Sequence, residues 1–121
     1  MSEEFLKVAR QEIGEDLESI DKILSGCKND GDILKNSVSL EKIFHKIKGL
    51  APMMDQNEMG TIAKQIDSIL KHVIANGILD GTYAVLTESH RIMREILDGS
   101  EAKDVEKILE KIKATFPKVL S

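Results

Sequence analysis

The chain has 121 residues, with 17 basic and 21 acidic side chains, which gives a net charge of −4 at pH 7. Aromatic residues make up 3% and tryptophan is missing, so neither a strongly positive surface nor a base-stacking platform for nucleic acid is expected. The single cysteine excludes an internal disulfide and a multi-cysteine metal site. The acidic start Met-Ser-Glu-Glu is unlike a signal peptide, and no apolar run reaches membrane length. We therefore expect a cytoplasmic protein that binds neither nucleic acid nor membrane.

Apolar residues recur every three or four positions along almost the whole chain, which is the period of amphipathic helices. Asp55 and Glu58 have the spacing of a capping box that opens the third helix. The predicted helices are 3–24, 40–54, 55–76, 82–97 and 100–116. Since short turns join them and no strand is convincing, we predict one all-α domain of residues 1–121. Four helices form an antiparallel bundle, and the fifth is added at the C-terminus.

Common enzyme motifs are missing from the sequence. No glycine-rich phosphate loop follows a strand, no zinc-protease histidine pair is present, and no nucleophile elbow organises the serines. The apolar stripes carry no facing Glu and His pairs, so we expect no metal site.

The second predicted helix carries the most informative side chain, His45. At about 100° per residue, His45 lies roughly 160° from the centre of the apolar stripe and so points away from this helix's own core face. Lys48, Gly49 and Pro52 lie on the same side as His45. Glycine inside a helix costs about 0.5–1 kcal/mol relative to alanine, so Gly49 needs a reason, and access to the imidazole is one. Met53, off the apolar stripe, is a candidate contact for a partner protein.

An exposed neutral imidazole is a nucleophile, and a phosphoryl group is the anion that a neighbouring lysine favours. Asp67 and Lys64 lie on one flank of the third helix. If this flank faces His45, Asp67 would accept a hydrogen bond from one ring nitrogen and Lys64 would add a second cation. The alternatives are an ordinary surface histidine beside a packing glycine, and an i,i+3 surface ion pair between Lys64 and Asp67.

The segment His45-Lys46-Ile47-Lys48-Gly49 resembles the H-x-[IL]-K-G signature of histidine-containing phosphotransfer (HPt) domains. The likeness is greatest to the N-terminal phosphotransfer domains of CheA-type chemotaxis histidine kinases, which also have an opening similar to Met-Ser-Glu-Glu-Phe-Leu. Asp67 and Leu70 stand where this family has a Glu-x-x-Leu element. The likeness covers nearly the whole chain and implies an HPt-type four-helix bundle.

The resemblance implies that His45 is the phosphoacceptor, through its ε nitrogen, and that Lys48 stabilises the phosphoryl group. It places Asp67 where the family has a glutamate that hydrogen-bonds the histidine, and Lys64 where a second histidine is common. Two partners are implied: a histidine kinase catalytic domain, which holds ATP and Mg²⁺, and a response-regulator receiver domain, which holds Mg²⁺. The chain itself would need no cofactor and would be monomeric. The alternative is an inert interaction domain of the same shape, which the unusual Pro52, Asp55 and Lys64 favour.

Overall fold

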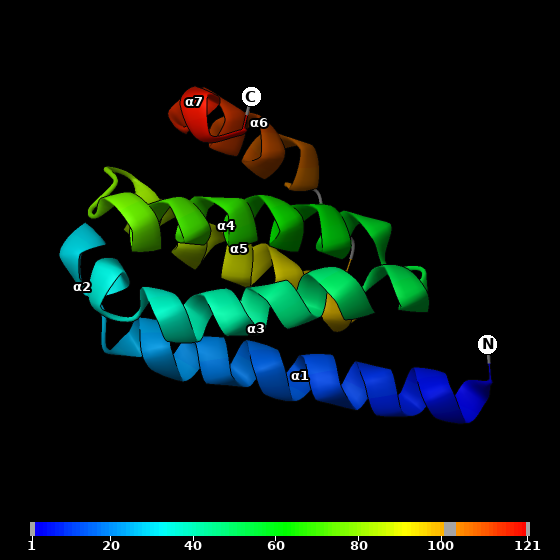
Figure 1. Cartoon of the computed structure of the whole chain (residues 1–121). Coiled ribbons are helices and arrows are strands. Elements are labelled where there is room, and N and C mark those ends of the chain that lie inside the picture. The colour runs from blue at the N-terminus through cyan, green and yellow to red at the C-terminus, as the bar shows by residue number, and fades with distance from the viewer. Residues whose placement is uncertain (1, 101–103, 121) are drawn as a thin grey trace.

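The computed structural model describes residues 2–100 and 104–120, which are all-helical with no strand (Figure 1). The elements are α1 (Glu3–Ser25), α2 (Asp30–Lys35), α3 (Ser37–Leu50), the 3₁₀ helix η1 (Pro52–Met54), α4 (Asn57–Asn76), α5 (Thr82–Leu97), α6 (Val105–Thr115) and α7 (Pro117–Leu120). Helices α1, α3, α4 and α5 lie side by side and alternate in direction, while α6 and α7 pack against α4 and α5. The predicted all-α antiparallel bundle is confirmed.

One cluster of buried apolar side chains fills the space between the long helices, with Phe44 of α3 among its largest members. Helices α3 and α4 pack together along their lengths, and His45 of α3 lies beside Asp67 of α4. Leu6 lies in the first turns of α1 and is 36% exposed, although it shares the apolar spacing of the predicted helix 3–24. No helix in the described ranges is both long and apolar enough to cross a membrane.

The segment between the predicted helices 3–24 and 40–54 was expected to be a turn, and this prediction is wrong because the segment contains helix α2. The Asn29 side chain accepts a hydrogen bond from the Asp32 backbone N–H at 2.9 Å, which caps the helix. Ile33 is fully buried and anchors α2 to the core. The Asp30 carboxylate accepts hydrogen bonds from the first backbone N–H groups of α5, at 3.0 Å from Gly81 and 2.7 Å from Tyr83. A short polar helix thus caps a longer one.

The predicted continuation of the second helix to residue 54 is also wrong, because α3 ends at Leu50 and Pro52 opens η1. Proline fits the first position of a helix, where its missing N–H has no intrahelical acceptor. Asp55 adopts a left-handed conformation with φ 63° and ends η1, so it does not form the predicted capping box. Helix α4 begins at Asn57 without a side-chain cap. Pro52 packs on Gly60, since a Cβ added at Gly60 would lie only 2.9 Å from Cγ of Pro52.

The C-terminal region differs from the predicted fifth helix at both ends. Ser100 is not helical, residues 101–103 lie outside the described part, and α6 begins at Val105. The predicted helix ends at residue 116, whereas α6 ends at Thr115 and Pro117 begins the further short helix α7.

Candidate functional site

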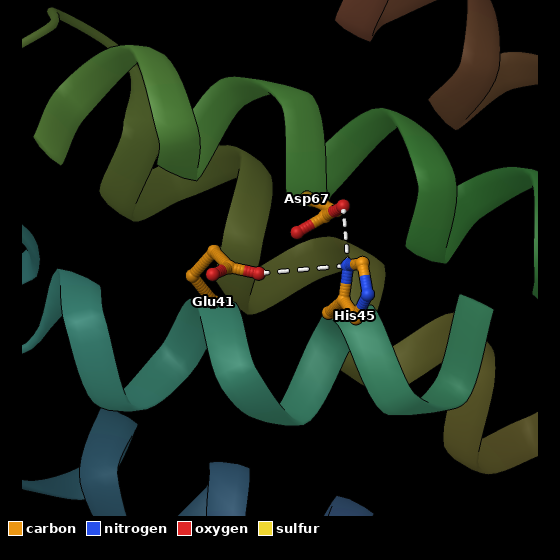
Figure 2. Close-up of side chains that lie close together, drawn as sticks. All are labelled: Glu41, His45 and Asp67. Atoms are coloured by element: carbon orange, nitrogen blue, oxygen red, sulfur yellow. Dashed lines mark hydrogen bonds and ion pairs between the residues drawn. The ribbon is translucent and has the colours of Figure 1, made fainter. Parts of the chain in front are cut away.

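His45 lies on the exposed flank of α3 that faces α4, and its side chain is 56% exposed. Its Nδ1 atom lies 3.2 Å from Oδ2 of Asp67 on α4 and 3.8 Å from Oε2 of Glu41, one turn earlier on α3. In Figure 2 both carboxylates lie on the Nδ1 side of the ring, and Nε2 is on the opposite side. Within the described ranges Nε2 has no hydrogen-bond partner. The geometry therefore leaves one ring nitrogen open to a reactant.

Asp67 is the buried centre of this site, with a side chain only 2% exposed. Its Oδ2 lies 3.2 Å from Nδ1 of His45, 3.1 Å from Nζ of Lys48 and 3.2 Å from Nζ of Lys71. Burial alone would raise the pKa of the Asp67 carboxyl, but hydrogen bonds with Glu41, Lys48, His45 and Lys71 outweigh it and lower that pKa to about 2. Asp67 is thus ionised at neutral pH, and Nδ1–H of His45 donates to it. This bond selects the tautomer in which Nε2 carries the free lone pair.

The second cation of the site is Lys71 rather than the predicted Lys64. Lys71 follows Asp67 by one helical turn and its ammonium group pairs with the carboxylate. Lys64 is exposed and lines a surface pocket beside Lys113 and Leu120 near the C-terminus. In the described part of the chain it pairs neither with Asp67 nor with His45. The i,i+4 spacing of Asp67 and Lys71 is the sequence signal for this pair.

Glu41 was also missed, although it precedes His45 by four residues and therefore shares its helix face. Its side chain is 20% exposed. Hydrogen bonding to Asp67, together with burial and the nearby Asp67 charge, raises the pKa of the Glu41 carboxyl. Glu41 and Asp67 thus form a carboxyl pair beside Nδ1 in which the pKa values move apart.

The surface beyond His45 is open along the last turn of α3. A Cβ added at Gly49 would meet no atom within 4 Å, so the helix face at this position is open. Met53 is 50% exposed and Pro52 is exposed at the end of the same face. The role of Gly49 in access to the ring stays a prediction, whereas Pro52 has a structural role through its contact with Gly60.

The ligand atoms of Glu41, His45 and Asp67 lie within 4.8 Å of one another, which is close enough for a shared cation. However, Lys48 and Lys71 already place two ammonium groups on Asp67. These charges offset the two carboxylates and oppose a further cation. Since both ammonium groups are held near the ring on its Nδ1 side, the open Nε2 is better suited to an anionic group than to a metal ion.

No protein family model, curated protein or solved structure matches this chain. The chemistry of the site is therefore inferred from its own residues and from the HPt-like sequence signature. Those residues supply an exposed nucleophilic nitrogen, a buried carboxylate that fixes the ring, and two ammonium groups on that carboxylate.

Proposed function

We propose that this chain is a histidine phosphotransfer module, in which His45 accepts a phosphoryl group from a kinase catalytic domain and passes it to an aspartate of a response-regulator receiver domain. The observation that carries the proposal is the geometry of His45. Its Nδ1 lies 3.2 Å from a buried, ionised Asp67, while Nε2 is free on an open surface. The finer proposal, a cytoplasmic chemotaxis-type phosphorelay, has its support in the sequence resemblance alone.

Phosphorylation of His45 follows from the tautomer that Asp67 favours. The Nε2 lone pair forms an N–P bond to the γ-phosphorus of ATP while the bond to the β,γ-bridging oxygen breaks, and ADP leaves with that electron pair. The proton remains on Nδ1, so the ring gains positive charge and the Asp67 carboxylate balances it. In the second step a carboxylate oxygen of the receiver attacks phosphorus, and the N–P electron pair returns to Nε2.

Lys48 would neutralise charge on the incoming phosphoryl group. Its Nζ lies 3.1 Å from the same Asp67 oxygen that His45 contacts, so its ammonium group is already held next to the ring. The Lys48 side chain is 32% exposed and can turn from the carboxylate toward a phosphoryl oxygen. Lys71 also pairs with Asp67 and is 54% exposed, so it can turn toward a phosphoryl oxygen in the same way.

The alternative of an inert interaction domain loses its best support in this structure. Pro52 lies beyond the end of α3 and Asp55 lies in the turn after η1, so neither residue distorts the helix that carries His45. Lys64 points to a different surface pocket. The departures from the family pattern thus leave the reacting group and its hydrogen bond in place.

The direct test is to incubate the whole chain with CheA-type kinase catalytic cores and radiolabelled ATP, and to measure acid-labile, base-stable phosphate. We expect His45→Gln to abolish labelling and to keep the helical melt, because the ring lies outside the core. We expect Lys48→Ala to slow labelling without unfolding the bundle. His72→Gln is the matched control, since His72 lies on α4 and hydrogen-bonds only locally to Asn76.

Two results would contradict the proposal. The first is labelling that persists in His45→Gln. The second is that the chain is labelled by none of several kinase cores, a phosphorylated receiver and a small phosphoramidate donor. This result would favour the inert interaction domain.

A further inference from the structure

We propose that Glu41 is a second positioning residue for His45, which acts with Asp67 to hold the proton on Nδ1 and keep Nε2 free. Glu41 Oε2 lies 3.8 Å from Nδ1, on the same side of the ring as Asp67 (Figure 2). At this distance the contact is electrostatic rather than a hydrogen bond. An Nδ1 lone pair facing two carboxylates is repelled, whereas an N–H dipole is attracted. The consequence for phosphoryl transfer rests on the proposed function, but the tautomer does not.

A second carboxylate is needed because Asp67 is shared among several donors. A single oxygen, Oδ2, accepts from His45, Lys48 and Lys71. Its distance of 3.2 Å to Nδ1 is at the long end of the normal hydrogen-bond range. The low pKa of Asp67 also makes it a weakly basic acceptor. Its preference for Nδ1–H is therefore weaker than that of an unshared carboxylate.

Glu41 is held where it can supply the missing interaction. It lies one turn before His45, on the α3 face that packs against α4, and only 20% of its side chain is exposed. Asp67 Oδ1 is buried and receives no N–H donor within the described ranges. A protonated Glu41 can donate to this oxygen, and an ionised Glu41 faces Nδ1 of His45. The carboxyl is thus kept beside the ring in both states, with Lys48 and Lys71 as the nearby cations.

The tautomer of neutral His45 can be measured by NMR on the whole chain with ¹⁵N-labelled histidine, with His45→Gln used to assign the signals. We expect Glu41→Leu to lower the ratio of Nδ1–H to Nε2–H about threefold to tenfold, because one of the two carboxylates that face Nδ1–H is lost. Glu41→Gln should recover part of the ratio, since the partial negative charge of its amide oxygen still attracts the Nδ1–H dipole. Labelling by a kinase core should slow by a similar factor in Glu41→Leu.

Glu88→Leu is the matched control, because Glu88, like Glu41, is a partly buried glutamate on a helix. Its side chain is 27% exposed and pairs with Lys111. This substitution should leave the His45 tautomer unchanged. The proposal would be overturned if the ratio of Nδ1–H to Nε2–H in Glu41→Leu equalled the ratio in Glu88→Leu. This must hold both with Asp67 intact and in an Asp67→Leu background. Normal phosphorylation with an unchanged tautomer refutes the role of Glu41 alone. A shifted tautomer in a chain that no donor labels supports that role and refutes the phosphotransfer function.

Discussion

Asp67→Asn tests whether the buried carboxylate of the site is charged and stabilising. The Asp67 side chain is 2% exposed, and its pKa falls from 3.8 to about 2 in the folded chain. Each pKa unit corresponds to about 1.4 kcal/mol, so ionised Asp67 contributes about 2 kcal/mol to the free energy of unfolding at neutral pH. The partial exposure of Lys48 and Lys71 makes this figure an upper value.

The pH dependence of this contribution has a definite sign. Because the folded pKa of Asp67 is lowered, its stabilisation is complete above the unfolded value of 3.8 and disappears as the pH falls toward 2. Glu41 acts in the opposite direction, since its raised pKa gives stability at low pH that is lost as the pH rises through that value. The effect of Asp67→Asn should therefore be measured both in the natural chain and in a Glu41→Gln background.

The assay is urea unfolding followed by far-ultraviolet circular dichroism between pH 7 and about pH 2.5. We expect Asp67→Asn to be less stable than the natural chain by up to about 2 kcal/mol at pH 7, and this gap should narrow as the pH falls from about 4 toward 2. Asp98→Asn, at an exposed aspartate, should show no such gap. A gap for Asp67→Asn that is the same at pH 7 and pH 2.5, or no gap at pH 7, would refute the reasoning.

Three further substitutions test the packing around the site. Gly49→Ala should raise the free energy of unfolding by about 0.5–1 kcal/mol, because its Cβ has open space, and should slow phosphoryl transfer by narrowing access to His45. Gly60→Ala should lower the free energy of unfolding by about 1 kcal/mol, since its Cβ would lie 2.9 Å from the rigid ring of Pro52. Equal effects of Gly49→Ala and Gly60→Ala in thermal melts would contradict this account. Asp30→Ala should cost about 1–2 kcal/mol by removing the cap of α5, and unchanged hydrogen-exchange protection at the start of α5 would show that the cap is dispensable.

The long helices could be predicted from the sequence because their apolar period is sustained over many turns, as in α4 and α5. Helix α2 could not, since a segment of 6 residues with one fully buried side chain, Ile33, is too short to show a period. Its position is tied to a tertiary contact, the cap that Asp30 provides to α5. The end of α3 was misjudged for a different reason. Proline is unfavourable inside a helix, but Pro52 occupies the first position of a new one, η1.

For the site, helix periodicity was enough to place His45, Lys48 and Asp67 on facing flanks, because that depends only on angles around each axis. It did not decide which lysine pairs with Asp67. Lys64 and Lys71 both lie within one turn of Asp67, and the choice between them depends on side-chain direction and on the neighbours of each lysine. The structure pairs Lys71 with Asp67, while Lys64 lies in a pocket near the C-terminal helices.

The sharing of Asp67 has a consequence for the proposed reaction. With neutral His45, Lys48 and Lys71 compete with Nδ1–H for the same oxygen. A phosphoryl group on Nε2 would attract one or both ammonium groups, and each lysine that leaves Asp67 frees that oxygen for the ring. Phosphorylation also makes the ring more positive, so Asp67 would bind it more strongly at the same moment. The lysines would thus stabilise the product twice, once by contacting the phosphoryl group and once by releasing the carboxylate to His45.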